Sequence, residues 1–187
     1  MKKIAVFASG SGSNFQALQE SIERGELNAS VELVVTDKPG AYVVTRADQF
    51  GIPVLELAPK MFESKAAYEE AIIAELRSRD VEWIVLAGYM RLVSDVLLEA
   101  YPNRIVNIHP SLLPSFPGKD AIGQAMEHGV KVTGVTVHYV DAGMDTGPII
   151  AQVAVEVVAG DRAATEERIH KAEHVLYTKT LQKLFAE

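Results

Sequence analysis

Short apolar runs alternate with helical patterns through the first part of the chain, and this alternation constrains the fold more than any other feature. The runs that predict strands cover residues 3–8, 31–36, 53–57, 83–88 and 104–108. The helical patterns between them cover residues 14–24, about 41–50, about 64–79 and about 94–100. Continuous apolar runs of this length are typical of strands covered on both faces, as in a parallel sheet. The sequence therefore predicts an α/β protein with a doubly wound, mainly parallel sheet.

The pattern changes after Gly118. Beyond a helix near residues 121–128, residues 130–140 and 148–158 alternate in polarity, which indicates an antiparallel hairpin attached to the sheet. A final helix is expected over residues 162–185, with packing positions at Ile169, Ala172, Val175, Leu176 and Leu184. No internal repeat or linker interrupts the sequence, so we expect one domain over the whole chain.

Composition narrows the class of partner. The chain has 187 residues, 48% of them hydrophobic, and a net charge of −7, which argues against a general nucleic-acid surface because phosphate neutralisation needs clustered Lys and Arg. Without cysteine it has no disulfide framework, thiolate metal site or cysteine nucleophile. The N-terminal apolar run is too short for a signal peptide or a membrane span, so a cytoplasmic protein is expected.

The first candidate site is the glycine-rich stretch "GSGSN" at residues 10–14, between the first expected strand and the first helix. Glycines let a ligand approach the backbone, and Ser13 or Asn14 is expected to cap the helix, leaving amides that fit a phosphate. The stretch lacks the Lys-Ser/Thr ending of a nucleoside triphosphate loop, and Phe15 replaces the third glycine of the dinucleotide fingerprint. A plain strand-to-helix turn is the alternative interpretation.

The second candidate lies in "IVNIHPSLLPSFPG", residues 105–118. Residues two apart on a strand share a face, so Asn107 and His109 project together at a carboxyl strand end, where open α/β sheets bind ligands. Pro110 keeps His109 extended, and Pro114, before which a cis peptide bond is expected, limits the loop. A satisfied core histidine is the competing interpretation.

The third candidate is Asp145 in the loop "DAGMDTGP", residues 141–148. Asp beside glycine commonly closes hairpins, so a turn is the simplest role. A functional role requires the loop to fold back beside His109.

Three longer stretches resemble a known family: "AGYMRLV" (residues 87–93), "NIHPSLLPSFPG" (107–118) and "VTGVTVHYVDAGMDTGPII" (132–150). They are similar to the folate-dependent formyltransferases over essentially the whole chain. The N-terminal "FASGSGSNFQAL" resembles the branch that moves a formyl group from 10-formyltetrahydrofolate to the amine of glycinamide ribonucleotide in purine synthesis. The resemblance implies a Rossmann-like formyltransferase fold, with a phosphate-binding half at about residues 1–100 and a catalytic and folate half at about 101–187.

The resemblance also implies roles for individual residues. The catalytic set would be Asn107, His109 and Asp145. Ribonucleotide contacts would come from Gly12, Ser13, Asn14, His170, Lys171, Ala172 and Glu173. Folate contacts would come from Lys65, Met90, Arg91, Leu92, Val93, Asn107, Asp141, Ala142, Gly143, Met144 and Asp145. Lys65 stands where some members carry arginine, His170 where some carry glutamine, and Ala142 where many carry an acid.

The implied reaction passes through a tetrahedral adduct, with Asn107 and His109 as donors to its oxyanion and Asp145 beside the imidazole. It needs 10-formyltetrahydrofolate as cosubstrate and no metal or covalent enzyme intermediate. The expected partners are the two small-molecule substrates, without nucleic acid or membrane, and the chain is expected to be a monomer or homodimer.

Alternatives remain open. A formyltetrahydrofolate hydrolase would use the same three residues but usually carries an extra regulatory domain. The methionyl-tRNA formyltransferases add a basic C-terminal segment, which the acidic balance of this chain disfavours. A noncatalytic nucleotide-binding module is the alternative from a different functional class.

Overall fold

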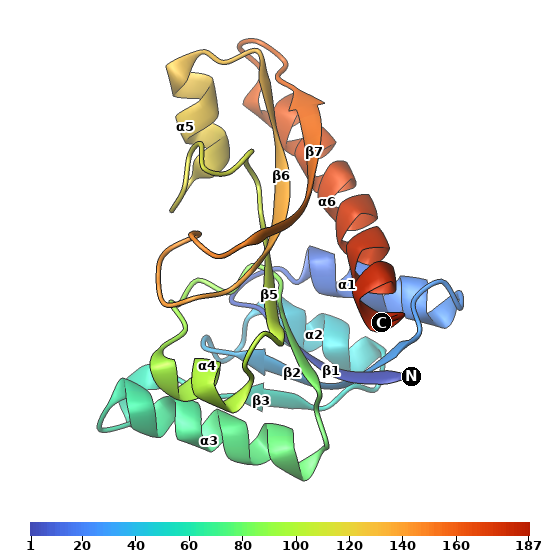
Figure 1. Cartoon of the computed structure of the whole chain (residues 1–187), viewed down its shortest axis with the longest axis vertical. Coiled ribbons are helices and arrows are strands. Elements are labelled where there is room, and N and C mark those ends of the chain that lie inside the picture. The colour runs from blue at the N-terminus through green and yellow to red at the C-terminus, as the bar shows by residue number, and fades with distance from the viewer. The chain divides into compact units, whose positions relative to one another are not determined.

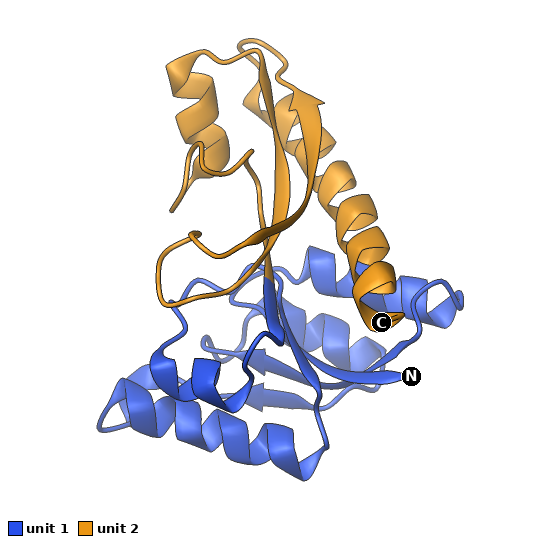
Figure 2. Cartoon of the chain, viewed as in Figure 1, with its two compact units in different colours: residues 1–106 blue, residues 107–187 orange.

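The structure, a computed structural model, describes residues 1–187 and divides into two compact units, Met1–Val106 and Asn107–Glu187 (Figure 2). The elements of the first unit are β1 (Lys2–Phe7), α1 (Ser13–Glu23), β2 (Ala29–Thr36), α2 (Tyr42–Gln49), β3 (Val54–Glu56), the 3-10 helix η1 (Pro59–Met61), α3 (Lys65–Ser78), β4 (Trp83–Leu86) and α4 (Asp95–Ala100). Strand β5 (Ile105–His109) begins in the first unit and ends in the second. The second unit continues with α5 (Ala121–His128), β6 (Val132–Tyr139), β7 (Ile149–Glu156) and α6 (Arg162–Phe185).

The first unit is a parallel sheet with helices on both sides. Its strand order is β3-β2-β1-β4, and every pairing given for these strands is parallel. Helices α1 and α2 lie on one side of the sheet, and α3 and α4 on the other (Figure 1). The order reverses at β1, and such a switch point is where open α/β sheets bind ligands at their carboxyl ends.

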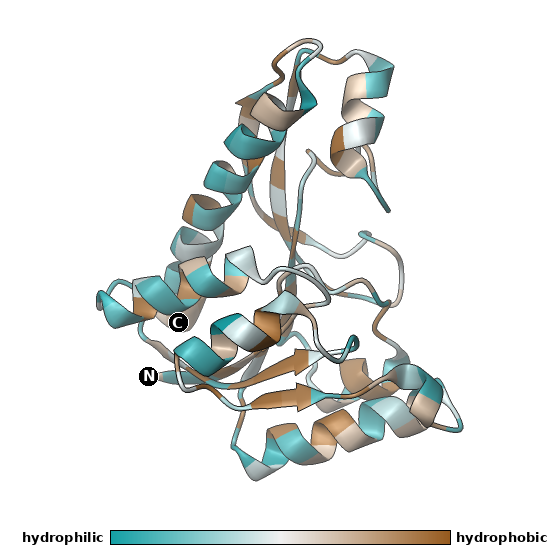
Figure 3. Cartoon of the chain, turned by 180° about the vertical axis from the view of Figure 1, so that it is seen from behind, coloured by the Kyte–Doolittle hydropathy of each residue, from teal (hydrophilic) through white to brown (hydrophobic).

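Apolar strands and one-sided helices build the core of this unit. β4 is buried at every position, and the last four residues of β1 are fully buried. Figure 3 shows β2 and β3 mainly in the hydrophobic colour, whereas the helices carry alternating hydrophilic and hydrophobic bands. Ser64 caps α3 by accepting a hydrogen bond from the backbone N–H of Ala67, which fixes where that helix begins.

The second unit is a long antiparallel hairpin flanked by helices. β6 pairs with β7, and a register shift between Val137 and His138 marks a bulge. Helix α6 packs along both strands, and its first residue, Arg162, donates a hydrogen bond to Asp120, the N-cap of α5, so the two helices are in contact (Figure 1). Asp161 begins α6, because its side chain accepts a hydrogen bond from the N–H of Ala164 at 2.9 Å.

One part of the expected packing of α6 is wrong. Val175 was an expected core position, yet 54% of its surface is exposed. The buried residues of α6 are Thr165, Ile169, Glu173, Tyr177, Thr180, Leu181 and Phe185. Apart from the adjacent pair Thr180 and Leu181, they recur at intervals of three or four residues, so the buried stripe includes polar positions that an apolar pattern alone does not mark.

The loop after β5 is braced by one hydroxyl of β6. Thr136 Oγ1 accepts from the N–H of Leu113 at 3.1 Å and from Gln152 Nε2 at 3.0 Å, and it donates to the carbonyl of Ser111 at 2.7 Å. The peptide bond before Pro114 is cis, so that expectation is confirmed. The loop that follows the two polar residues of β5 is therefore fixed to the hairpin from within the same unit.

Replacing Thr136 with Val tests this bracing. We expect the free energy of unfolding to fall by about 2–3 kcal/mol, because buried partners lose their hydrogen bonds. Urea unfolding of the two proteins measures the difference. The matched control is Thr133→Val on the same strand, since Thr133 is equally buried and its hydroxyl has no hydrogen-bond partner. Equal losses in both variants would contradict the bracing role.

The expected fold class is confirmed, with a parallel sheet, an antiparallel hairpin and a final helix. The sequence pattern missed η1, because one turn of helix leaves no periodic signal. None of the helices combines the length and apolar character that crossing a membrane requires.

Candidate active site

Asn107 and His109 lie at the end of β5 within the second unit. His109 is only 6% exposed, and its Nε2 lies 2.9 Å from the carbonyl oxygen of Phe116. A carbonyl can only accept, so Nε2 carries a hydrogen and donates it. Ser111 Oγ donates to the same carbonyl at 3.2 Å, and the oxygen thereby fixes the orientation of the ring. The second ring nitrogen, Nδ1, is left to face the loop that carries Asp145.

The loop between β6 and β7 brings Asp145 to this ring. Asp145 Oδ2 lies 3.6 Å from His109 Nδ1 and accepts a hydrogen bond from the N–H of Gly118 at 2.8 Å. Asp145 adopts a φ of 55°, a conformation that Asp tolerates better than most residues. The geometric condition for a functional Asp145 is therefore met, because the loop folds back beside the imidazole.

A second histidine, which sequence reasoning missed, completes the cluster. His138 lies on β6 and is 2% exposed, with Nε2 3.3 Å from Asn107 Nδ2 and 3.8 Å from Asp145 Oδ1. The sequence carried one signal for this role. His138 lies one residue from the end of its strand and directly before the loop that carries Asp145. Asp145 thus has an imidazole beside each carboxylate oxygen.

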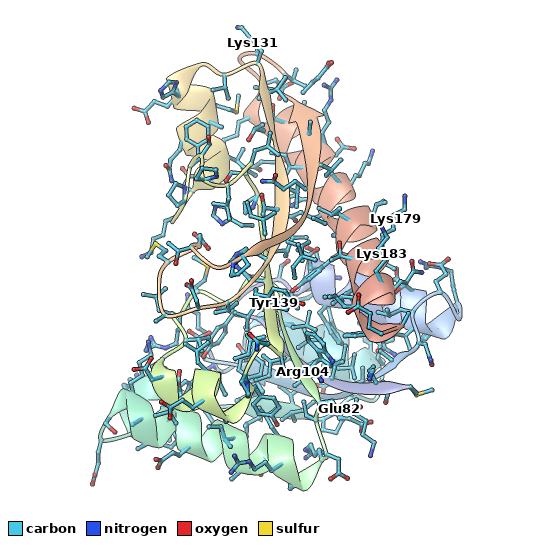
Figure 4. The ribbon with its side chains drawn as sticks, viewed as in Figure 1. Glu82, Arg104, Lys131, Tyr139, Lys179 and Lys183 are labelled. Carbon is cyan, nitrogen blue, oxygen red and sulfur yellow. The ribbon has the colours of Figure 1, made fainter.

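The hydrogen bonds of His138 show which of its ring nitrogens carries the hydrogen and which accepts. His138 Nδ1 lies 2.9 Å from the carbonyl of Tyr139, the last residue of β6 (labelled in Figure 4), so Nδ1 carries the hydrogen. Burial lowers the pKa of His138, and the bond to Tyr139 and the carboxylate of Asp145 offset this only in part. The ring is therefore neutral near pH 7, and its Nε2 accepts from Asn107. The second amide hydrogen of Asn107 remains available for a ligand oxygen.

The lowered pKa of His138 makes stability depend on pH in a defined direction. The unfolded chain takes up a proton below about pH 6.5, whereas the folded chain resists protonation at this ring. The contribution of neutral His138 to stability is complete above that pH and decreases as pH falls below it. We expect the unaltered protein to lose more free energy of unfolding than His138→Gln between about pH 7.5 and 5.5.

Urea unfolding at several pH values measures this difference. The matched control is His128→Gln, which removes an exposed imidazole from α5 of the same unit and should keep the pH dependence of the unaltered protein. Parallel stability curves for the unaltered protein and His138→Gln would contradict the assignment.

The rest of the 141–145 stretch forms a structured turn. Asp141 Oδ1 accepts from the N–H of Gly143 at 3.0 Å and from Thr146 Oγ1 at 2.6 Å. Ala142 and Met144 are exposed, and Met144 offers a large apolar side chain to solvent. The turn therefore holds its backbone in place without using these two side chains.

In the first unit, the expected phosphate loop differs from expectation in its cap. Neither Ser13 nor Asn14 caps α1; Gly12 is the N-cap, with a φ of 76° and no side-chain hydrogen bond. A Cβ at Gly12 would lie 2.6 Å from Val43 Cγ2, so both the conformation and the space require glycine. Arg46 Nε donates to the carbonyl of Ser11 at 2.6 Å, which holds the loop against α2. The N-cap residue itself therefore contributes no side-chain hydrogen bond at the start of α1, which is where an anion site would lie.

The residues of the first unit that were expected to contact folate differ in their exposure to solvent. Lys65 is the first residue of α3 and is exposed. Met90 is 58% exposed and Leu92 is 47% exposed, and Arg91 is also exposed, whereas Val93 is buried. The segment 90–93 thus anchors itself through Val93 and presents apolar side chains outward.

On α6, His170 and Glu173 form a pair. His170 Nδ1 lies 3.1 Å from Glu173 Oε2, and the hydrogen bond to this buried carboxylate raises the pKa of His170. Lys171 is exposed and Ala172 is partly buried, so the four positions do not form one polar surface. No group of three or more His, Cys, Asp or Glu residues is arranged to hold a metal ion.

Residues 2–181 match the family profile described as formyl transferase. The chain belongs to the formyl transferase family. Among relatives of this formyl transferase, the phosphoribosylglycinamide formyltransferase of Bacillus subtilis (strain 168) is 57% identical over 185 residues, which cover 98% of this chain and 95% of the relative.

Solved structures resemble this formyl transferase closely. The phosphoribosylglycinamide formyltransferase of Bacillus halodurans superposes with a TM-score of 0.96 at 53% identity, covering 100% of this chain and 96% of that one. The glycinamide ribonucleotide transformylase 1 of Geobacillus kaustophilus superposes with a TM-score of 0.95 at 58% identity, covering 98% of each chain.

Proposed function

We propose that this formyl transferase moves the formyl group of 10-formyltetrahydrofolate to the amine of glycinamide ribonucleotide in purine biosynthesis. The products are formylglycinamide ribonucleotide and tetrahydrofolate. The observation that carries the proposal is the cluster in the second unit, where Asn107, His109 and Asp145 lie together with His138. The names of the most similar relatives support the choice of substrates.

Asn107 and His109 supply what the first chemical step requires. The amine nitrogen attacks the formyl carbon, and the electrons of the carbon–oxygen double bond move onto oxygen. Asn107 has one amide hydrogen not used by His138, and it donates this hydrogen to the oxyanion. A protonated His109 adds a charged donor from Nδ1, because Nε2 is occupied by the carbonyl of Phe116.

The second step breaks the bond between the formyl carbon and the folate nitrogen. That nitrogen takes a proton as it leaves, and His109 Nδ1 is the group that supplies it. The attacking amine loses a proton, which Asp145 accepts through water. Asp145 is suited to this role because its carboxylate lies beside both imidazoles and its loop is held by the N–H of Gly118. No covalent bond to the enzyme forms in this sequence of steps.

We assign the ribonucleotide contacts to two places. In the first unit, the backbone N–H groups of Gly12, Ser13 and Asn14 would bind the phosphate, supported by the uncapped start of α1. In the second unit, the pair of His170 and Glu173 would contact the ribose hydroxyls or the glycinamide part, with Lys171 and Ala172 beside them.

We assign the folate contacts to segments with exposed apolar side chains. Met90 and Leu92 suit the flat pterin ring, and the backbone of Arg91 and Val93 offers hydrogen bonds to its polar edge. The turn of Asp141, Ala142, Gly143, Met144 and Asp145 would contribute backbone groups in the second unit. Lys65 would provide a positive charge for the carboxylates of the folate tail.

We propose that the two compact units act as one catalytic domain, since a single family profile covers residues 2–181. The proposed partners are the two small-molecule substrates, with the protein acting in the cytoplasm as a monomer or homodimer and without nucleic acid or a metal ion.

The test is a turnover assay with a formyl-folate, followed by folate absorbance, with and without glycinamide ribonucleotide. The proposal expects turnover only when the ribonucleotide is present, with formylated product in equal amount. Turnover without the amine would identify a hydrolase instead. No turnover together with ligand binding would identify a noncatalytic binding module.

A further inference from the structure

A buried polar network in the first unit lies beneath the segment 90–93. Asp37 directly follows β2, and its side chain is only 6% exposed. Ser9 follows β1 and is 4% exposed, and its Oγ donates to Asp37 Oδ1 at 2.5 Å. A buried carboxylate costs free energy unless hydrogen bonds and charges compensate it, so its position requires an explanation.

Both oxygens of the Asp37 carboxylate take part in interactions that reach the segment 90–93. Ser9 Oγ accepts a hydrogen bond from the backbone N–H of Met90 at 2.9 Å, which links Oδ1 to Met90 through the serine. Asp37 Oδ2 lies 4.0 Å from Arg91 Nε, and the Arg91 guanidinium lies 6.0 Å from the centre of the Tyr68 ring. Asp37 is therefore connected to two consecutive residues. It is linked to Met90 by way of Ser9, and it forms an ion pair with Arg91.

The segment has a second anchor at its other end. Glu69 on α3 accepts a hydrogen bond from the N–H of Ser94 at 3.0 Å and from the N–H of Leu97 at 3.1 Å. Residues 89–93 lie in no helix or strand, so their conformation depends on anchors at each end rather than on a regular ladder of backbone bonds. Met90 and Leu92 remain exposed between the two anchors.

We propose that Ser9 and Asp37 are positioning residues for the formyl-folate site: they hold the Met90 amide and the Arg91 side chain so that residues 90–93 present a preformed surface to the pterin ring. This inference rests on the proposed function, which assigns the segment to folate. It adds two residues that do not themselves touch the ligand.

Each variant of Ser9 or Asp37 removes a different part of the network. Ser9→Ala removes the link to Met90 and leaves a backbone N–H without its acceptor. Asp37→Ala removes the acceptor of Ser9 and the charge beside Arg91. Asp37→Asn keeps an oxygen that accepts from Ser9, but it loses the charge and places an NH2 group where Oδ2 faced Arg91. Because Ser9 and Asp37 act in one chain of contacts, their effects should not add.

The experiment measures binding of tetrahydrofolate and of glycinamide ribonucleotide to the full chain by titration calorimetry. We expect Ser9→Ala and Asp37→Ala each to weaken tetrahydrofolate binding by roughly tenfold, and the double variant to be no weaker than about twice either one. Asp37→Asn should recover only part of the loss, because it restores the acceptor of Ser9 but not the ion pair with Arg91. The affinity for the ribonucleotide should stay within about twofold of that of the unaltered protein. The control Asp48→Ala, which removes an exposed carboxylate of α2, should leave the affinity for both ligands unchanged.

Turnover separates this inference from the proposed function. In the two alanine variants, KM for formyl-folate should rise while kcat at saturation stays within about threefold of the unaltered enzyme. Unchanged tetrahydrofolate binding in both variants, or equal weakening of both ligands, would overturn the positioning role. If the unaltered chain binds tetrahydrofolate but transfers no formyl group to the ribonucleotide, the proposed function fails and the binding test of Ser9 and Asp37 still decides the inference.

Discussion

Replacing His109 with Ala is expected to lower kcat by about 10²–10⁴-fold while KM for either substrate changes by less than about fivefold. In His109, Nε2 donates its hydrogen to the carbonyl of Phe116, which leaves Nδ1 for the reaction. Nδ1 lies 3.6 Å from Asp145 Oδ2. A group placed there can donate to the oxyanion and then pass its proton to the departing folate nitrogen. Both tasks arise after the substrates have bound, so their loss affects turnover rather than affinity.

Steady-state kinetics with both substrates varied checks this result. His109→Gln serves as the comparison variant, because its amide can donate a neutral hydrogen bond but cannot deliver a proton. It should fall between the unaltered enzyme and His109→Ala. Since His109 is buried, thermal unfolding of each variant accompanies the kinetics. A folded His109→Ala variant with kcat within about threefold of the unaltered value would contradict the proposed role.

Asn107→Ala is expected to lower kcat by about 10²–10³-fold, or roughly 3–4 kcal/mol of barrier, through the loss of a neutral donor to the oxyanion. The amide is oriented by His138, whose Nε2 accepts one of its hydrogens and leaves the other for the ligand. The same steady-state assay measures the effect, and KM should change little.

A second substitution distinguishes charge stabilisation from packing at this position. Asn107→Asp keeps the shape of the side chain but replaces the donor with a negative acceptor close to the transition-state oxygen. We expect it to be at least as slow as Asn107→Ala, because a carboxylate opposes the developing charge. Glu127→Gln, which changes an exposed charge on α5, controls for altered net charge and should be neutral. A faster Asn107→Asp than Asn107→Ala would indicate that shape matters more than donation.

The sequence predicts the fold well, because the fold depends on local periodicity. The alternation of apolar runs and helical patterns leads directly to the parallel sheet, and the change to period-two alternation leads to the β6–β7 hairpin. Errors occur where polar residues are buried. On α6 the stripe contains Glu173 and Thr180, so an apolar pattern assigned Val175 to the core in their place.

The candidate site was only partly predictable. The strand period placed Asn107 and His109 together, but the position of Asp145 depends on how a loop folds back, and local pattern does not specify that. His138 was missed because a single histidine in an alternating strand does not differ in pattern from a core residue. Its importance follows from three contacts, to Asn107, Asp145 and Tyr139, which only the folded chain brings together.

The cap of α1 was mispredicted for a related reason. Ser13 and Asn14 are good capping residues in isolation, but Gly12 adopts a left-handed conformation that begins the helix one residue earlier. The close approach of Val43 to Gly12 is a contact between segments far apart in sequence, so no local rule contains it.

The boundary between the two compact units falls inside β5, between Val106 and Asn107. Every residue assigned to the bond-making steps lies after this boundary, whereas the phosphate loop and the network of Ser9 and Asp37 lie before it. Substitutions in the phosphate loop or in this network would therefore change substrate recognition while leaving the reacting groups as a complete set.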